Sequence, residues 1–226
     1  MRRELLSDAE IIAAWRANAA PWTKAVRTGE IESRRLATDR AMVDAIVARA
    51  PRSVLDVGCG EGWLARALSS RGIEVIGIDV VPALIEQAQK AGGGEFRVLA
   101  YEALADGKID LHVDLVACNF SLLGRESVDT VVTAAKSLLS PGGALIVQTL
   151  HPLIVGTDHA YVDGWREGSW AGFSEDFVRP APWYFRTLES WVRLFTTNGW
   201  RLEELREPIH PVTGKPASIL FIVRPV

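Results

Sequence analysis

The chain is poor in cysteine. Its 226 residues include only Cys59 and Cys118, which stand far apart and form no C-x-x-C pair. Two isolated cysteines cannot build a disulfide framework or a structural zinc site, and the four histidines show no metal-ligand spacing either. We therefore expect no bound metal, and a reducing compartment, the cytoplasm, as the location of the protein.

Long apolar runs are also missing. No stretch reaches the roughly 18 consecutive apolar residues of a membrane-spanning helix, and the first residues show no apolar core of an export signal. The sequence therefore predicts a protein that has no membrane partner.

Basic residues do not cluster, and the formal net charge is −3. Affinity for nucleic acid comes mainly from grouped Lys and Arg side chains that displace counterions from phosphates. The charge pattern thus argues against a nucleic-acid partner and favours a small molecule. Apolar residues are plentiful at 48%, which is enough for one well-buried core.

Two amphipathic helices are predicted before any strand. The first covers residues 7–19 with Ser7 as its N-cap, and the second covers residues 33–50. We assign residues 1–50 to an N-terminal helical cap and residues 51–226 to the main domain.

From residue 53 onward, short β-branched runs alternate with helical stretches, which is the pattern of βαβ units. This pattern predicts an α/β fold with a Rossmann-like, doubly wound, mostly parallel sheet and a final antiparallel strand. The predicted strands are 53–57, 74–78, 96–99, 114–119, 144–149, 200–205 and 218–223. The predicted helices of this domain are 62–70, 82–91, 127–139 and 187–198.

Residues 151–186 show no regular period and include Trp165, Trp170 and Trp183. A connection of this length inside a compact domain is usually functional. Its aromatic content predicts a lid, inserted after the fifth strand, that contributes to substrate binding.

The strongest local signal is a strand that runs into three alternating glycines. Residues 54–62 read V-L-D-V-G-C-G-E-G, and Gly58, Gly60 and Gly62 precede a predicted helix. Glycine permits the tight strand-to-helix turn and lets the main chain approach a flat ligand closely. Asp79 ends the next strand, where its carboxylate can accept both hydroxyl hydrogens of a ribose.

This motif and the strands around it resemble the class I S-adenosylmethionine-dependent methyltransferases, in particular the bacterial small-molecule branch that includes ubiquinone-biosynthesis-like enzymes. The resemblance spans residues 53–149 and implies that residues 51–226 form a methyltransferase domain. It implies S-adenosyl-L-methionine as the cofactor, a small-molecule acceptor and methyl transfer as the reaction. It leaves open whether oxygen, nitrogen, carbon or sulfur is methylated.

The resemblance also implies cofactor-binding residues. Around the methionine part it places Asp56, Gly58 and Gly60, with the small Cys59 between the two glycines. It places Asp79 on the ribose and Val80 beside the adenine. At the end of the fourth strand it places Asn119 and Phe120 next to the methyl group.

The chain departs from the family pattern after the third strand. There the family usually offers Asp to the adenine amino group, whereas this chain has Tyr101, Glu102 and Ala103. Either Tyr101 or Glu102 is expected to fill that role, so we assign it to the segment.

His151 follows the fifth strand, at the sheet edge where open α/β sheets bind ligands. Imidazoles titrate near neutrality, so His151 is a candidate catalytic base for an acidic acceptor. The alternative is a histidine that hydrogen-bonds to the lid backbone.

Candidate substrate residues come from the end of the lid. Trp183 and Tyr184 offer aromatic surface, and Arg186 offers a charge for a substrate carboxylate, although a solvated Arg at a helix start explains it as well. From the N-terminal region, we expect Trp15, Asn18, Trp22 and Arg34 to close over the cofactor.

Three alternative functions share features with this sequence. A protein that binds S-adenosylmethionine or S-adenosylhomocysteine without turnover would share the fold. A nicotinamide-dependent oxidoreductase is disfavoured because the glycine spacing is G-x-G-x-G, not G-x-G-x-x-G. A nucleic-acid methyltransferase is disfavoured because residues 119–122 read N-F-S-L and not Asn-Pro-Pro-aromatic. The sequence indicates no oligomeric state.

Overall fold

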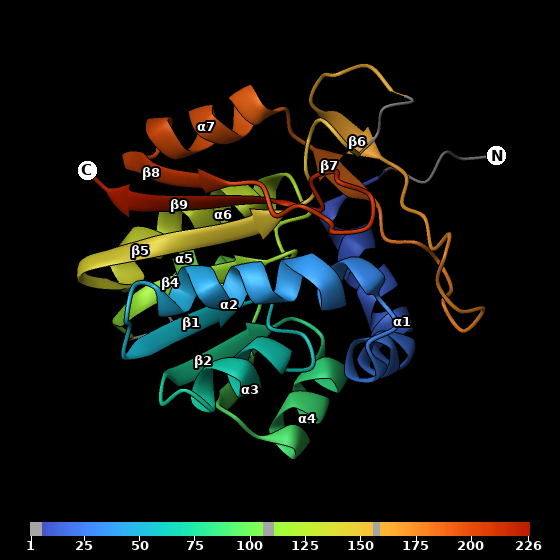
Figure 1. Ribbon diagram of the computed structural model, residues 1–226, viewed down its shortest axis with the longest axis horizontal. Helices are drawn as coiled ribbons and strands as arrows, with labels where there is room; N and C mark the ends of the chain where they lie inside the picture. The colour runs from blue at the N-terminus through green and yellow to red at the C-terminus, as the bar shows by residue number, and fades with distance from the viewer. Residues whose placement is uncertain (1–5, 106–110, 156–158) are drawn as a thin grey trace.

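The computed structural model describes residues 6–105, 111–155 and 159–226. Parts of the predicted cap and lid, residues 1–5 and 156–158, lie outside the described residues. In the described chain a seven-stranded sheet has the order β3-β2-β1-β4-β5-β9-β8 (Figure 1). Its strands are β1 Ser53–Val57, β2 Glu74–Asp79, β3 Glu95–Val98, β4 Val113–Asn119, β5 Leu139–Thr149, β8 Trp200–Arg206 and β9 Ile219–Pro225.

The five strands β1 to β5 run parallel, and β9 is antiparallel to both of its neighbours, β5 and β8. The predicted Rossmann-like sheet with a final antiparallel strand is therefore confirmed. Chain order reverses between β1 and β4, and a ligand cleft is expected at this switch point, outside the carboxyl ends of the strands.

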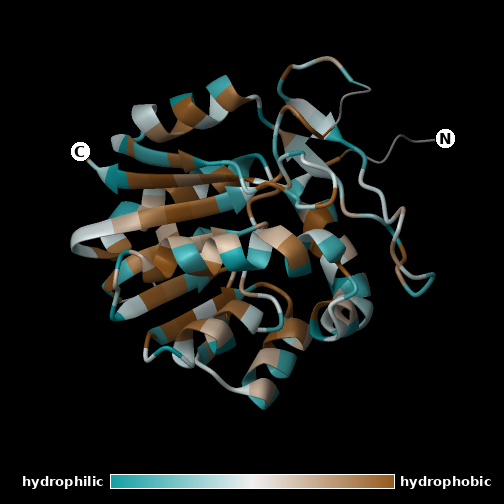
Figure 2. Ribbon diagram, in the orientation of Figure 1, coloured by the Kyte–Doolittle hydropathy of each residue, from teal (hydrophilic) through white to brown (hydrophobic). Residues whose placement is uncertain are grey.

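Helices cover both faces of the sheet. Leu, Ile and Ala side chains of α2 Asp39–Val47, α3 Trp63–Ser69 and α4 Pro82–Ala91 form one apolar layer with the strands. The opposite layer contains side chains of α5 Glu102–Ala105, α6 Glu126–Ala134, the 3₁₀ turn η2 Ala135–Leu138 and α7 Leu188–Thr197. The strands are correspondingly apolar on both sides, as Figure 2 shows for the centre of the sheet.

The first helix, α1 Asp8–Thr28, ends nine residues later than the predicted 7–19 segment. The Ser7 hydroxyl accepts a hydrogen bond from the Glu10 N–H, which confirms the predicted N-cap. The helix continues through Pro21, whose ring removes one backbone donor, because Trp22 packs beyond it against α4. No helix among the described residues has the length and apolar character to cross a membrane.

The second predicted helix, 33–50, contains a widened turn. Residues Arg34–Thr38 form a π-helix, η1, which continues directly into α2. Turns of this kind are rare in proteins, and those that occur often lie at functional sites. This one places the Arg34 side chain in a buried position.

The predicted lid has some secondary structure. Short strands β6 Gly164–Arg166 and β7 Trp183–Phe185 pair antiparallel, at the end of the main sheet where the parallel strands finish (Figure 1). The helix α1 lies at the same end. Cap and lid elements thus gather at the edge where a ligand site is expected.

Candidate functional site

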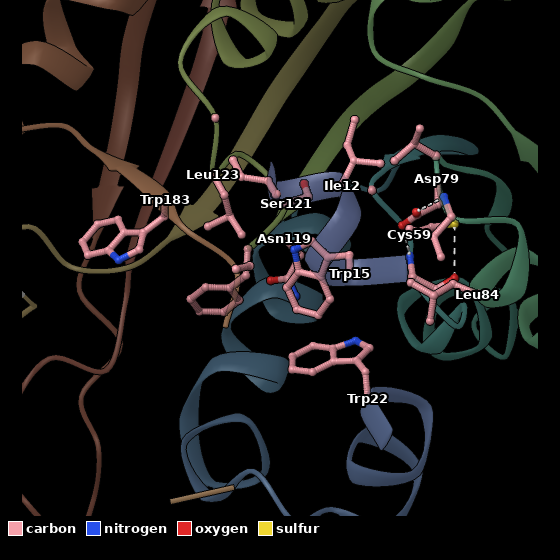
Figure 3. A pocket seen from close by; sticks show the side chains of 18 of the residues that line it. Ile12, Trp15, Trp22, Cys59, Asp79, Leu84, Asn119, Ser121, Leu123 and Trp183 are labelled. Atoms are coloured by element: carbon pink, nitrogen blue, oxygen red, sulfur yellow. Dashed lines mark hydrogen bonds between the residues drawn. The ribbon is translucent and has the colours of Figure 1, made fainter. Parts of the chain in front are cut away.

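A cavity of about 420 Å³ opens at the carboxyl ends of the parallel strands. Its wall combines the glycine turn after β1, the ends of β2 and β4, one side of α1, and the lid. In Figure 3, Asp79 and Cys59 lie on one side, Trp183 lies on the other, and Asn119 lies between them. The volume suits small-molecule ligands.

Two glycines of the turn are required by their backbone conformation, and one of them is also required by a close neighbour. Gly58 has a φ of +75°, and a Cβ there would lie 2.3 Å from the Ser121 Cβ. Gly60 has a φ of +56°, and the nearest atom to its added Cβ would be Trp22 Nε1 at 3.8 Å. The main chain at Gly60 is therefore open towards the cavity, as close approach to a ligand requires.

Asp79 joins the glycine turn to the end of β2. Its carboxylate accepts hydrogen bonds from the N–H groups of Gly60 at 3.0 Å and Val81 at 2.9 Å. Burial raises the pKa of Asp79, and these backbone donors oppose that effect. Asp79 lines the cavity together with Val80 and Cys59.

Asp56 does not line the cavity, although it lies in the same motif. Its Oδ2 atom is buried and has no hydrogen-bond partner among the described residues. Burial, and secondly the Asp79 carboxylate, raise the pKa of Asp56 from 3.8 to about 7. A cation bound nearby would favour its ionised form.

Arg34 is the principal cation of the cavity wall. The sequence predicted that it closes over the cofactor, but not which part of the cofactor it contacts. Its guanidinium lies 4.8 Å from the Trp63 ring centroid, and its Nε donates to Asp39 at 2.9 Å. Its Nη2 is buried without a partner among the described residues. The π-turn that places it there leaves no recognisable sequence pattern.

The segment expected at the adenine is only partly in the wall. Tyr101 and Glu102 line the cavity, whereas Ala103 does not. The Tyr101 hydroxyl donates to the Ser121 carbonyl at 3.2 Å. It also lies 2.6 Å from the position that a Cβ on Gly58 would take, so it faces the glycine turn. Glu102 is exposed at the start of α5, and its carboxylate is open to a ligand.

Asn119 and Phe120 line the cavity at the end of β4, as predicted. Phe120 has a φ of +53°, which is unusual for a bulky residue, and its N–H donates to the Gln148 carbonyl at 2.8 Å. This left-handed turn lies where the resemblance places the reacting methyl group.

Aromatic side chains of α1 and the lid form a large part of the cavity wall, from the residues next to Asp79 onward. Trp15 contacts Trp22 edge-on at 4.9 Å between ring centroids and Trp170 at 5.9 Å. All three line the cavity with Trp183 and Phe173. The lid and α1 thus contribute one continuous apolar wall.

Two of the predicted substrate residues lie outside this wall. Arg186 is buried and donates to the carbonyls of Gly124 at 2.8 Å and Arg125 at 2.9 Å. The N–H of Tyr184 donates to the Leu123 carbonyl at 2.7 Å, and neither side chain lines the cavity. These contacts fasten the lid to the start of α6, so neither the substrate role nor the solvated position expected for Arg186 matches its surroundings.

His151 is also buried outside the cavity wall. Its Nε2 lies 2.7 Å from Glu207 Oε1, and its Nδ1 accepts the Leu153 N–H at 3.2 Å. Both ring nitrogens therefore have partners. This arrangement favours the alternative interpretation, a histidine that binds the lid backbone.

The two cysteine thiols are buried and free. Burial is the main cause that raises the pKa of both thiols, with the Asp56 carboxylate as the next cause. They stay protonated and are poor nucleophiles.

The helix α1 forms a roof over the cavity and is held at both ends. At its start, the Asp8 carboxylate accepts the N–H groups of Arg125 at 2.9 Å and Ser127 at 2.7 Å. Near its end, Arg27 Nε donates to the buried Glu61 carboxylate of the glycine turn at 2.8 Å. Two regions distant in sequence are therefore tied together by one helix.

The chain is similar to known methyltransferases. Residues 54–143 match a family described as a methyltransferase domain. A ubiquinone biosynthesis O-methyltransferase from Xylella fastidiosa is 33% identical over 184 residues, which cover 73% of this chain and 71% of the relative. The chain belongs to the class I S-adenosylmethionine-dependent methyltransferases.

This methyltransferase chain matches other relatives over a smaller part. It covers 65% of a second Xylella fastidiosa relative with the same description, at 34% identity over 170 residues. It covers about half, 49%, of one from Pseudomonas entomophila, at 33% identity over 114 residues, which are 48% of this chain. Similarity alone therefore does not transfer the relatives' activity to it.

Solved structures share its fold. The 1,6-didemethyltoxoflavin-N1-methyltransferase of Burkholderia thailandensis has a TM-score of 0.68 at 17% identity, covering 100% of this chain and 93% of that one. An S-adenosylmethionine-dependent methyltransferase of Clostridium acetobutylicum has a TM-score of 0.67 at 13% identity, and the match covers 90% of this chain and 98% of that one. At these identities the likeness shows the fold alone.

Proposed function

We propose that this protein transfers a methyl group from S-adenosylmethionine to a small, largely apolar molecule. The observation that carries this proposal is a cavity with Asp79 at its polar end, Trp183 at the opposite end and Asn119 between them, beneath aromatic side chains of α1 and the lid. The curated relatives are O-methyltransferases by description, which supports the same reaction type.

The residues at the polar end fit the cofactor. Asp79 offers a charged acceptor to the ribose hydroxyls, and Glu102 offers one to the adenine amino group. Arg34 has a buried, unpartnered Nη2 that can donate to the methionine carboxylate. Asp56 has a buried, unpartnered Oδ2 near the same turn, and its negative charge favours a bound ammonium or sulfonium.

S-adenosylmethionine supplies a methyl group on a positively charged sulfur. Bound beside an acceptor, it would give this methyl group to a lone pair of the acceptor and leave as S-adenosylhomocysteine, and an acidic acceptor would release its proton to the solvent outside the cavity. The protein has to align the two molecules and exclude water. The apolar wall assists because the sulfonium charge disappears during transfer and is poorly solvated there.

The acceptor is proposed to be a small molecule and not a nucleic acid. A net charge of −3 gives no general attraction to phosphates. We propose that residues 1–50 act as a cap and residues 151–186 as a lid, because α1 and the lid together form the aromatic wall. An acceptor must fit beneath them.

Calorimetry with S-adenosylhomocysteine and with NAD tests the cofactor assignment. We expect S-adenosylhomocysteine to bind and NAD not to bind. Arg34→Ala should weaken binding about 10- to 100-fold, because a charged hydrogen bond is lost, with Arg34→Lys weakened less. Arg40→Ala, at an exposed position on α2, is the matched control and should bind as the wild type does.

Turnover then separates an enzyme from a non-catalytic binding protein. Phenols, N-heterocycles and thiols are incubated with S-adenosylmethionine, and release of S-adenosylhomocysteine is measured. Tight NAD binding with no binding of either sulfur nucleoside would overturn the proposal. If S-adenosylmethionine binds but no phenol, N-heterocycle or thiol is methylated, the result would favour the non-catalytic binding protein.

A further inference from the structure

Gln148 on β5 contacts the polar residue at the centre of the cavity. It lies beside Asn119 of β4 in the sheet register and is almost completely buried. Its Nε2 donates to Asn119 Oδ1 at 2.6 Å and to the Thr38 carbonyl at 3.0 Å. Its Oε1 accepts the Ser218 hydroxyl at 3.3 Å.

These contacts fix which way both amides point. The Thr38 carbonyl can only accept a hydrogen bond, so the Gln148 amide must turn its Nε2 towards it. The same Nε2 faces Asn119, which must therefore present its oxygen to Gln148. A carbonyl at the end of the π-turn thus determines the orientation of a side chain in the cavity wall.

The consequence is a free hydrogen-bond donor in the cavity. With Oδ1 bound to Gln148, Asn119 keeps Nδ2 for another partner, and no acceptor among the described residues takes it. Asn119 is half-buried and lines the cavity between Asp79 and Trp183 (Figure 3). The donor therefore lies between the polar end of the cavity and Trp183 at the opposite end.

Gln148 also holds the backbone next to this donor. Its carbonyl accepts the N–H of Phe120, the residue with the left-handed φ of +53°. Such strained conformations persist only where neighbouring contacts enforce them. One buried residue therefore fixes the Asn119 side chain and the Phe120 main chain together.

Building on the proposed function, we propose that Gln148 is a positioning residue that makes Asn119 a hydrogen-bond donor to the methyl acceptor. The acceptor class that fits is a flat, apolar molecule with a hydrogen-bond-accepting oxygen or nitrogen beside the atom that is methylated. Trp183, which lies on the side of Asn119 opposite Asp79, offers an aromatic face or edge to its ring. A molecule with only donor groups at that place leaves Asn119 Nδ2 unpaired.

The probes are quinoline and naphthalene, which have nearly the same shape and differ by one accepting ring nitrogen. Each is titrated into ¹⁵N-labelled protein saturated with S-adenosylhomocysteine, and affinities are read from the indole N–H resonances of the cavity tryptophans. We expect quinoline, but not naphthalene, to shift the Asn119 side-chain amide resonances.

Variants test the donor and its orientation separately. Asn119→Asp removes the donor and should lower the quinoline-to-naphthalene affinity ratio by about five- to tenfold, the effect of one net hydrogen bond. Gln148→Leu frees the Asn119 amide to turn and should lower the ratio in the same direction. Ser218→Ala is the matched control, because the Thr38 carbonyl still fixes Gln148, and its ratio should equal that of the wild type.

The possible outcomes are distinct. An equal ratio in wild type and Asn119→Asp, or no binding of either probe, overturns this inference even if S-adenosylhomocysteine binds. Failure to bind S-adenosylhomocysteine instead contradicts the proposed function. If Gln148→Leu does not fold, an unshifted ratio in the Asn119→Asp protein still refutes the donor role.

Discussion

Asn18 of α1 and Val178 of the lid bind each other in both directions. The Val178 N–H donates to Asn18 Oδ1 at 2.8 Å, and Asn18 Nδ2 donates to the Val178 carbonyl at 2.6 Å. The Asn18 side chain is completely buried in this contact. A single side chain therefore fastens the lid to the helix that forms the roof of the cavity.

The first prediction concerns this fastening. Asn18→Ala leaves the Val178 N–H and the Arg179 carbonyl without their partner, whereas the Val178 carbonyl keeps Trp170 Nε1 as a donor. The lid should therefore detach more often. We expect amide hydrogen exchange in residues 168–181 to accelerate at least about tenfold, the equivalent of about 1.4 kcal/mol. Affinity for S-adenosylhomocysteine should change little, because the ribose and carboxylate anchors lie elsewhere.

Lys24→Ala is the control for this prediction. Lys24 pairs with Asp176 of the lid, but both side chains are exposed, and exposed ion pairs contribute little to stability. Exchange in the lid should stay within about twofold of the wild-type rate. Unchanged exchange in Asn18→Ala would show that the aromatic contacts and ion pairs between α1 and the lid hold the lid without Asn18.

The second prediction concerns Asp79. Asp79→Asn and Asp79→Ala should each weaken S-adenosylhomocysteine binding by about 2 to 4 kcal/mol, because the ribose loses a charged acceptor in a buried site. The Ala variant should also melt at a lower temperature, since the N–H groups of Gly60 and Val81 lose their acceptor. Calorimetry and thermal unfolding separate the two effects.

Asp176→Asn, an exposed change in the lid, serves as the control. Its affinity should match the wild type. A folded Asp79→Asn protein with an unchanged dissociation constant would mean that another group binds the ribose.

Local sequence patterns predicted the sheet well. The parallel strands are short apolar runs between helices, and each predicted strand overlaps an observed one, with exact agreement for 53–57. The glycine turn and Asp79 were predictable because strand, turn and helix follow one another in the chain. Short-range chemistry is sufficient for features of this kind.

Features that depend on distant partners were not predictable. The helix α1 continues past Pro21 because Trp22 packs on α4, far along the chain. His151 is bound by Glu207, 56 residues later, and Arg186 by carbonyls more than 60 residues earlier. No periodic pattern in the sequence predicts such pairs, and none predicts the contacts of Gln148.

The third prediction follows from the contacts of His151. We propose that it stabilises the lid base, so His151→Ala should lower the free energy of unfolding by about 1 to 3 kcal/mol, because Glu207 and the Leu153 N–H lose a buried partner. Methyl transfer should fall less than about threefold, whereas loss of a general base lowers turnover about 10²- to 10⁴-fold. Glu207→Gln should have a similar but smaller effect on unfolding. If turnover instead falls about 10²- to 10⁴-fold while the free energy of unfolding is unchanged, His151 would be the catalytic base.

The last prediction concerns the dependence of stability on pH. Asp56 is buried beside Asp79, and its pKa rises from 3.8 to about 7 in the folded protein. The folded state therefore retains a proton that the unfolded state has released at pH values between about 4 and 7. The free energy of unfolding therefore falls as the pH rises through this window, and it has lost the whole contribution of the Asp56 proton above the window.

Asp56→Asn removes this titration while keeping the shape of the side chain. Relative to the wild type, the unliganded variant should gain about 2 to 4 kcal/mol of unfolding free energy between pH 4 and pH 8. Urea unfolding at both pH values measures this difference, with Asp176→Asn as an exposed control whose gain should be near zero. S-adenosylmethionine should bind the Asn variant more weakly at pH 8, because the negative charge that favours its ammonium and sulfonium groups is gone. If the unfolding free energies of wild type and variant change with pH in the same way, Asp56 ionises in the folded protein as it does in the unfolded one. Ionisation of this buried carboxyl at low pH would require a cationic partner, and the described residues provide none.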